Sequence, residues 1–369
     1  MIEFNLRVQT LRDRVYNQSK KNEEKFSKSF AFTSANLNYF LPSINSCQHK
    51  LFYKSCLYNQ HLSSIEEDDF ETIDSLNIIN NTSFKDINDI KNSQNPIIFT
   101  TFHLGSYRML NSFLAKHGFN STLIVDEEVY LGQKESFLKS WEKVDNHYRN
   151  SSSFTVLNAE KRSIILTLMR QIKNNNTVLV VYLDGNTGTG KKLNKNPNLK
   201  TINFLKNEMF VRKGFAFLSN ILKATVIPVL SYRENEKNNL HFFKEMVSDS
   251  NISKDESINQ IINYNFSNFE RFLLKFPEQW EGWFYMHKWF DLNRYEKQPY
   301  NETDVIKGKM NFERYMPFKY CIDQYFIFDK TNYSSCPISK ELYNNLWNNN
   351  IELIDSEIKN KLITINVII

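Results

Sequence analysis

A histidine at the end of a buried strand is the first candidate for chemistry. The short apolar run 96–102 is rich in β-branched and aromatic residues, which predicts a buried strand. His103 follows this run and leads into a turn at Gly105 and Ser106, and residues 107–116 then have helical apolar spacing. Because open α/β sheets place their chemistry at strand ends, His103 is a candidate catalytic residue. The alternative is a histidine that only packs at the strand end.

Asp184 is the second candidate, because it ends the clearest strand of the sequence, 177–183. An acidic side chain there, followed by Gly185, can orient a histidine or a substrate hydroxyl across the sheet. The alternative interpretation is an Asx turn that simply ends the strand. Asp126 and Glu127 are weaker candidates of the same kind, since they end another predicted strand.

A glycine-rich loop follows Asp184 and nearly fits the phosphate-binding pattern GxxxxGK[ST] over residues 185–192. Lys192 stands where serine or threonine must supply the magnesium-ligating hydroxyl. The following run, which includes Pro197, cannot open the helix whose N-terminus should hold the phosphates. We therefore favour a mobile substrate loop over a nucleotide site.

Further charged and aromatic residues follow these strands. Arg212, Lys213 and Arg233 are candidates to hold a phosphate or an acidic carrier, or they are solvated surface charges. An aromatic cluster near residues 280–290 is interpreted most simply as core. Its alternative role is to form a wall for an acyl chain or a foothold on a membrane.

The composition indicates a globular, mildly basic protein. Hydrophobic residues make up 41% of the 369 residues and aromatic residues 14%, which excludes a disordered chain. The formal charge of +5 suits an anionic membrane surface, an acidic carrier protein or a phosphate-bearing substrate, but it is too weak to indicate nucleic acid. The four cysteines are far apart in two pairs, so we expect reduced thiols rather than a disulfide or a metal site.

Targeting signals are not recognisable in the sequence. The N-terminus carries charges throughout and lacks the apolar core of a signal peptide. Nowhere do 18 apolar residues follow one another, so no transmembrane helix is expected. We therefore predict a cytoplasmic protein whose contact with the inner membrane surface is at most peripheral.

Alternating strands and helices predict an α/β fold with a mixed, mostly parallel sheet flanked by helices. The predicted strands are 96–102, 121–127, 154–157, 177–183, 225–232 and 240–243. The predicted helices are 107–116, 161–173, 210–223 and 255–276, and residues 129–150 lack a regular pattern.

The pattern divides the chain into three parts. We predict a helical N-terminal cap over 1–93, the α/β domain over 94–291 and a linker up to residue 312. Residues 312–369 are predicted to form a small winged-helix-like domain. Its predicted elements are a strand at 325–329, helices at 338–347 and 355–362, and a closing strand at 363–369.

Five motifs occur in an order that is typical of one enzyme family. They are His103-Leu104-Gly105-Ser106-Tyr107-Arg108, Tyr182-Leu183-Asp184-Gly185-Asn186-Thr187, Gly214-Phe215-Ala216-Phe217-Leu218-Ser219, Ile227-Pro228-Val229 and Pro277-Glu278-Gln279-Trp280. Over about residues 95–290 the chain thus resembles the bacterial lipid A biosynthesis acyltransferases, the lauroyl and myristoyl transferase branch of the lysophospholipid acyltransferase superfamily. The resemblance implies a glycerolipid acyltransferase-like fold.

The resemblance also implies the reaction. An acyl group would pass from an acyl-carrier protein or acyl-CoA thioester to a hydroxyl or amine, with His103 as general base and no other cofactor or metal. The candidate substrate-binding residues are Gly105, Ser106, Tyr107, Gly185, Asn186, Thr187 and Gly214 from these motifs, together with the cations Arg108, Arg212 and Lys213.

Arg108 departs from the family, which has an acid at the end of its HX4[DE] motif. A cation there lowers the pKa of His103 instead of stabilising its charged form. Either another carboxylate, best Asp184, orients His103 and frees Arg108 to bind an oxyanion or a carrier phosphate, or the site is altered or inactive. The second case is a catalytically silent acyltransferase fold that binds a lipid, an acyl carrier or a peptide.

The acceptor is open, because the chain lacks the membrane anchor that is usual in the lipid A enzymes. A soluble metabolite or a peptide is an alternative to a lipid. The C-terminal segments 325–329, 338–343 and 362–363 resemble the small winged-helix modules that bind a leader peptide as an added strand. A plain structural cap is the favoured interpretation of this part, and a peptide partner is the alternative.

Overall fold

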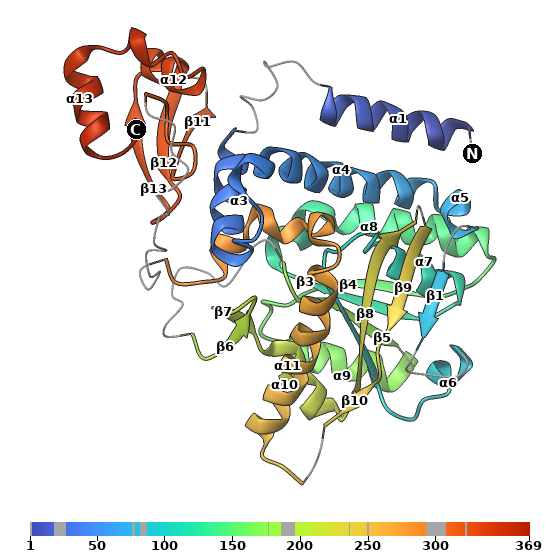
Figure 1. The fold of residues 1–369 in the computed structure, drawn as a ribbon. Helices are drawn as coiled ribbons and strands as arrows, with labels where there is room; N and C mark the ends of the chain where they lie inside the picture. Colours follow the sequence, from blue (N-terminus) through green and yellow to red (C-terminus); the bar gives the residue numbers. More distant parts are fainter. Residues whose placement is uncertain are drawn as a thin grey trace. The chain divides into compact units, whose positions relative to one another are not determined.

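The computed structural model of the chain is drawn in Figure 1. It describes residues 2–17, 27–75, 78–81, 87–175, 177–185, 196–235, 237–248, 251–292, 308–321 and 323–369. The chain divides into two compact units. The first comprises Met1–Leu11, Cys56–Phe204 and Glu208–Gly282, and the second comprises Arg12–Ser55, Leu205–Asn207 and Trp283–Ile369.

A mostly parallel sheet forms the centre of the first unit, which confirms the predicted fold class (Figure 1). Its described strands lie in the order β1-β9-β8-β2-β5-β3-β4. Their bounds are β1 Ile78–Asn81, β2 Ile97–Thr101, β3 Ser121–Val125, β4 Phe154–Asn158, β5 Val178–Tyr182, β8 Thr225–Glu234 and β9 Lys237–Phe242. Only the β8–β9 pair in this series is antiparallel, and β10 (Met246–Val247) pairs antiparallel with the start of β8.

Helices cover both faces of this sheet. They include α7 (Met109–Lys116), α8 (Glu127–His147), α9 (Ile164–Asn175), α10 (Gly214–Leu222) and α11 (Lys254–Leu273). Successive residues of a strand point to opposite faces. Phe99 of β2 accordingly lies in the core that α7 and α8 share, whereas the next residue, Thr100, donates a hydrogen bond to Asn265 of α11.

The described residues before β2 are largely helical, as predicted. The helices are α1 (Ile2–Tyr16), α3 (Ser27–Phe40), α4 (His49–Asp68), α5 (Phe70–Asp74) and α6 (Ile87–Lys91), with a short 3-10 helix, η1, at Ser46–Gln48. The strand β1 also lies in this region and pairs in parallel with β9. Four residues are too short a run for period-two alternation to be recognised in the sequence.

Two element predictions in the first unit are wrong. Residues 129–150 are regular: α8 begins after Asp126, whose carboxylate caps the helix by accepting from the Val129 N–H. The pattern was weak because Leu131 of α8 is 78% exposed.

The second error is the helix predicted over 210–223. The strand β7 (Asn207–Arg212) comes first, paired with β6 (Leu199–Phe204), and α10 begins only at Gly214. The hairpin turns at Leu205 and Lys206, both with positive φ. Neither residue type signals the two-residue turn that usually requires asparagine or glycine, so the hairpin left no sequence signal.

A three-stranded antiparallel sheet follows within the second unit, in the order β11-β12-β13. Its elements are β11 (Tyr315–Cys321), β12 (Gln324–Asp329), β13 (Ser334–Ile338), α12 (Lys340–Trp347), the 3-10 helix η7 (Ile351–Leu353) and α13 (Ser356–Thr364). The closing strand predicted over 363–369 is wrong, because α13 continues to Thr364 and only Ile368 forms an isolated bridge, with Met310.

Both outer strands of this small sheet contain a proline, Pro317 in β11 and Pro337 in β13. Proline has no backbone N–H, and natural proteins use it on edge strands to discourage pairing with a further strand. These residues count against the addition of a peptide strand, and the predicted peptide partner stays a prediction.

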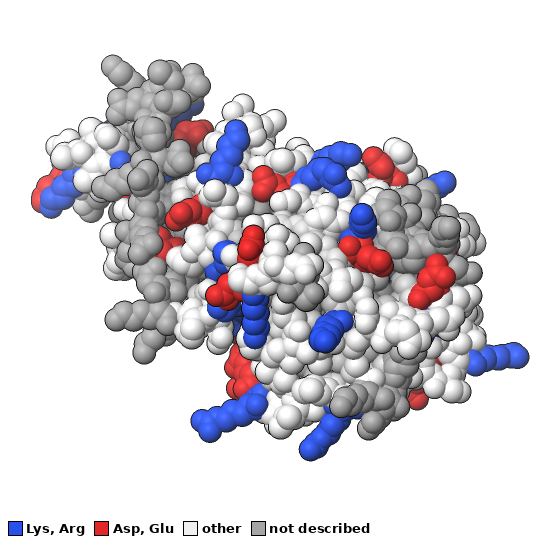
Figure 2. Space-filling model, turned by 90° about the horizontal axis from the view of Figure 1, so that it is seen from below, with Lys and Arg blue, Asp and Glu red and all other residues white. Residues whose placement is uncertain are grey.

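Positive and negative side chains are mixed on one face of the molecule (Figure 2). On the face drawn in Figure 2, lysine and arginine side chains are interspersed with aspartate and glutamate. Within the described ranges, no helix is both long enough and apolar enough to cross a bilayer.

Candidate active site

The register of two central strands places His103 beside Asp184. Thr101 of β2 pairs in parallel with Tyr182 of β5, and the Leu183 N–H donates to the Thr101 carbonyl at 2.9 Å. His103 and Asp184 each come two residues after this last aligned pair. Because parallel strands end at the same edge of a sheet, the two side chains leave the sheet together.

Asp184 contacts His103 through three hydrogen bonds. The ring Nδ1 lies 2.8 Å from Asp184 Oδ1, and the backbone N–H of His103 donates to both carboxylate oxygens at 3.0 and 3.2 Å. Trp280 Nε1–H donates to Oδ2 at 2.6 Å from the segment after α11. An ionised carboxylate only accepts, so Nδ1 carries the proton and Nε2 keeps its lone pair for an incoming proton.

The environment of His103 favours a charged ring. Burial acts to lower its pKa, but the charge of Asp184 and the hydrogen bond to it outweigh burial, and the pKa is raised. The side chain of His103 keeps 21% of its surface exposed, against 5% for Asp184. A ring of this kind is open on one side to a reactant and held by a fixed carboxylate on the other.

Two tyrosines pack against the histidine ring. Tyr107 lies edge-on and Tyr182 is tilted, each with its ring centroid 4.7 Å from that of His103. The Tyr182 hydroxyl donates to the Tyr107 carbonyl at 3.2 Å, and burial raises the pKa of both hydroxyls. The two tyrosines therefore stay neutral and restrict the orientation of the His103 ring.

The turn after His103 requires a glycine at position 105. Gly105 has φ +57°, and a Cβ there would lie 2.7 Å from Tyr232 Cα and 2.8 Å from the Ser231 carbonyl oxygen. Its N–H donates to the Gln279 carbonyl at 3.0 Å. The turn is thus fitted closely between β8 and the segment that carries Trp280.

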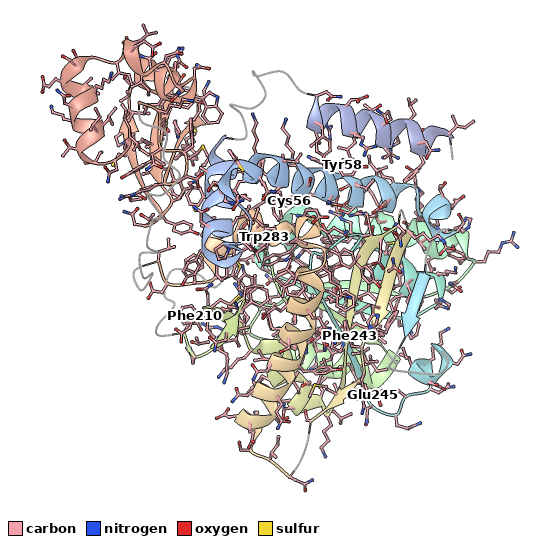
Figure 3. All side chains as sticks on the ribbon, in the orientation of Figure 1. Cys56, Tyr58, Phe210, Phe243, Glu245 and Trp283 are labelled. Carbon is pink, nitrogen blue, oxygen red and sulfur yellow. The ribbon has the colours of Figure 1, made fainter. Side chains whose placement is uncertain are left out.

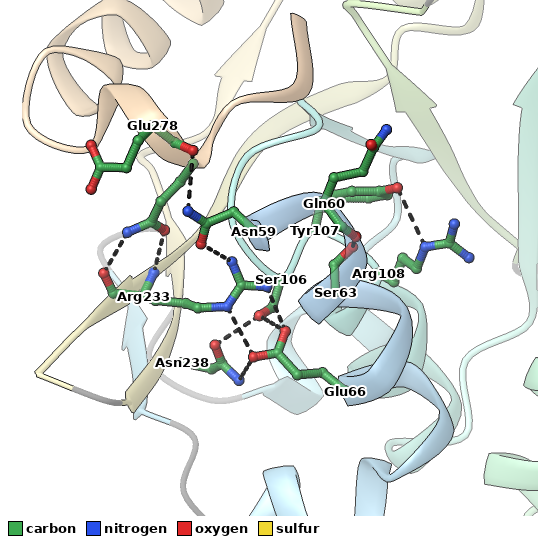
Figure 4. A network of polar contacts seen from close by, with 11 residues as sticks. Asn59, Gln60, Ser63, Glu66, Ser106, Tyr107, Arg108, Arg233, Asn238 and Glu278 are labelled. Carbon is green, nitrogen blue, oxygen red and sulfur yellow. Dashed lines mark hydrogen bonds and ion pairs between the residues drawn. The ribbon is translucent and has the colours of Figure 1, made fainter. Parts of the chain in front are cut away.

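Ser106 belongs to a buried polar network behind the same turn (Figure 4). Its hydroxyl oxygen lies within hydrogen-bond distance of Glu66 Oε2 and of Asn238 Oδ1, and it has one hydrogen to donate to this pair of acceptors. Glu66 also accepts from Arg233 Nη2 at 2.6 Å and Nε at 2.9 Å. Arg233 in turn donates from Nη1 to Asn59 at 2.9 Å. This network connects α4, the turn and the β8–β9 pair, so it supports the position of the turn.

Arg108 contacts an acid of α4. Its Nη1 donates to Glu67 at 2.6 Å. Its Nε donates to the Tyr107 hydroxyl at 3.3 Å (Figure 4). A cavity of about 110 Å³ adjoins this ion pair, and its walls include Glu66, Glu67, Arg108, Phe113 and Lys116. The cation that departs from the family motif is thus paired.

The other predicted substrate residues lie on different elements. Arg212 ends β7, Lys213 precedes α10 as its N-cap residue, and Gly214 begins α10. Gly185 directly follows Asp184, and a Cβ at Gly185 or Gly214 would meet nothing within 4 Å. Asn186, Thr187 and the rest of the loop through residue 195 lie outside the described residues.

Four residues around the His103–Asp184 pair, called the dyad below, were not predicted from the sequence: Tyr182, Glu66, Glu67 and Glu281. Glu66 and Glu67 belong to the acidic run 66–69, a pattern that is typical of a solvated surface, yet Glu66 is only 5% exposed. Glu281 adjoins the Pro277–Trp280 motif, which was the available signal. Among the described residues no group of three or more His, Cys, Asp or Glu side chains could hold a metal ion.

The dyad can act as a base supported by a buried carboxylate. An acceptor proton can move to His103 Nε2, and Asp184 then stabilises the imidazolium through Nδ1.

The model of the bacterial lipid A biosynthesis acyltransferase family matches residues 32–291, more than half of the chain. None of the curated proteins compared with the chain is significantly similar to it.

Proposed function

We propose a specific reaction for a chain that belongs to the bacterial lipid A biosynthesis acyltransferase family and is therefore an acyltransferase. It moves a fatty acyl group from an acyl-carrier-protein or acyl-CoA thioester to a hydroxyl or amine acceptor. His103 is the general base of this reaction, Asp184 orients it, and the thioester is the only co-substrate. The acceptor is a soluble metabolite, a peptide or a lipid.

The observation that carries the proposal is the contact between His103 Nδ1 and Asp184 Oδ1 at 2.8 Å, with the ring still partly exposed. His103 Nε2 takes the proton of the acceptor as its oxygen or nitrogen attacks the thioester carbonyl carbon. The tetrahedral intermediate then collapses with cleavage of the carbon–sulfur bond. The imidazolium returns the proton to the leaving thiolate, so that the products are the acylated acceptor and the free thiol.

The test compares the wild-type protein with His103→Ala in the discharge of acyl-carrier protein and acyl-CoA thioesters over a panel of hydroxyl and amine acceptors. Loss of the base is expected to lower the rate at least about a hundredfold. His147→Ala is the matched control, since that histidine is 41% exposed on α8. Transfer by His103→Ala as fast as by the wild type would contradict the mechanism.

A second candidate function rests on Arg108, the cation in the position of the family acid. In this alternative the fold is catalytically silent and binds a lipid, an acyl carrier or a peptide. Binding of an acyl-carrier protein by the wild type without turnover of any acceptor would favour it. Turnover that depends on His103 would exclude it.

A further inference from the structure

Arg108 acts against a base at His103. The charge of Arg108 lowers the pKa of His103, because two neighbouring cations disfavour the imidazolium. The ion pair with Glu67 offsets part of that charge at a distance of 2.6 Å. The family has an acid at the position of Arg108, and its negative charge stabilises the protonated histidine. A further carboxylate close to His103 would supply the same negative charge here.

Glu281 lies where such a carboxylate is required. It directly follows Trp280, and its backbone N–H donates to the His103 carbonyl at 3.1 Å. The bridge between Leu104 and Trp280 fixes the same two segments to each other. The turn that carries Glu281 is therefore attached to the backbone of the base itself.

The carboxylate of Glu281 is only half satisfied by hydrogen bonds. Its Oε2 accepts from Gln60 Nε2 at 3.3 Å and the carboxylate also interacts with the Tyr107 hydroxyl, whereas Oε1 is buried and lies within hydrogen-bond geometry of no group in the described residues. A buried polar atom without a hydrogen-bond partner destabilises the folded state. Because native proteins keep few such atoms, this one calls for an explanation in function.

Electrostatic interactions connect Glu281 to the whole site. Burial raises the pKa of the Glu281 carboxyl, while the charges of His103 and Arg108 act in the opposite direction. Glu281 in turn acts to raise the pKa of His103, and it interacts with the Tyr107 hydroxyl. The Glu281 carboxylate thus interacts electrostatically with both His103 and Arg108.

We propose that Glu281 is a positioning residue that supplies, from the turn after Trp280, the negative charge that the family places at position 108. This inference rests on the proposed function, because it concerns the same base. Glu281 exchanges no proton in the reaction. Its carboxylate stabilises the imidazolium while His103 holds the acceptor proton, and Asp184 holds the ring through Nδ1.

The direct test is an NMR titration of His103 in the wild type and in Glu281→Gln. Removal of the negative charge is expected to lower the pKa of His103, which needs no substrate to be measured. Glu245→Gln is the matched control, because this exposed glutamate after β9 loses the same charge elsewhere (Figure 3). An unchanged pKa of His103 in folded Glu281→Gln overturns the inference.

The kinetic test follows kcat/KM against pH. In Glu281→Gln the acid limb is expected to move to lower pH and the plateau to fall on the order of tenfold, whereas Glu281→Asp retains the charge and keeps the wild-type limb. A purely structural role would lower the plateau without moving the limb, and that result overturns the inference. If instead wild type and His103→Ala react equally, the proposed function fails while the NMR result still decides the role of Glu281.

A double variant tests the balance between the two charges and covers a loss of folding in Glu281→Gln. Arg108→Met alone is expected to raise the pKa of His103, and Arg108→Met with Glu281→Gln is expected to return it toward the wild-type value. A double variant that is more active than Glu281→Gln supports the inference. A double variant in which the pKa of His103 falls as far as in Glu281→Gln contradicts it.

Discussion

Two histidines of this chain each have an oxygen 2.8 Å from Nδ1, yet their pKa values are shifted in opposite directions. His103, in the first unit, has Nδ1 at 2.8 Å from Asp184 Oδ1, and His49, in the second unit, has Nδ1 at 2.8 Å from the Ser34 hydroxyl. The pKa of His103 is raised. Burial and the charge of Lys330 lower the pKa of His49 to about 4.

The partner oxygen and the exposure of the ring account for the difference. His49 is fully buried, its Nε2–H donates to the Ile44 carbonyl at 3.0 Å, and Lys330 Nζ donates to the same Ser34 hydroxyl at 3.1 Å. Both ring nitrogens of His49 are thus used within the core, and a cation replaces the carboxylate. A histidine needs one ring nitrogen with a free lone pair to act as a base, and a carboxylate on the other nitrogen stabilises the protonated ring.

The largest effect is expected from the substitution that removes the Asp184 charge, because this charge distinguishes the site of His103 from that of His49. Asp184→Asn gives His103 a neutral partner, as His49 has, and should lower both its pKa and the rate, the rate by about a hundredfold. The same assay as for His103→Ala measures it. Asp126→Asn is the control, because asparagine also caps a helix well and Asp126 ends the neighbouring strand β3. Equal rates for wild type and Asp184→Asn would remove Asp184 from the mechanism.

The next effect tests the structural role of His49. His49→Ala leaves the Ser34 hydroxyl and the Ile44 carbonyl without their partner in the core, so the free energy of unfolding should fall by about 2 kcal/mol. Denaturant unfolding measures this loss, and the activity per folded molecule should stay at the wild-type level. A drop in activity without a loss of stability would instead make His49 part of the chemistry.

The smallest effect concerns the pH dependence of stability. Burial lowers the pKa of Lys330 to about 8 in the folded chain, below its ordinary value of 10.5. Above pH 8 the unfolded chain therefore binds more protons than the folded one at this group, and stability gained from it rises with pH up to about 10.5.

Unfolding free energies of wild type and Lys330→Met at pH 7.5 and 9 measure this contribution. The wild type should gain on the order of 1 kcal/mol relative to the variant between the two values. The variant serves as the reference because other groups titrate in the same range. Parallel pH profiles of the two proteins would show that Lys330 stays charged in the folded state.

The sequence predicted the strands of the central sheet well where apolar runs were continuous. Residues 96–102 and 177–183 were recognised because strands buried on both faces read as apolar runs, and β2 and β5 occupy most of each. The β6–β7 hairpin and the helix α8 were missed, because the turn at Leu205 lacks a glycine or asparagine and Leu131 is exposed. Local patterns fail where an element is fixed by its neighbours.

The sequence by itself determined where the two candidate residues of the proposed reaction stand: His103 after one buried strand and Asp184 after another. These are local signals, because a strand end and the residue type after it can be recognised within ten positions. The tertiary structure alone decided how the charges around His103 are balanced. Glu67 and Glu281 come from segments far from Arg108 in sequence, and only the packing of α4 and the Trp280 segment against the turn brings them together.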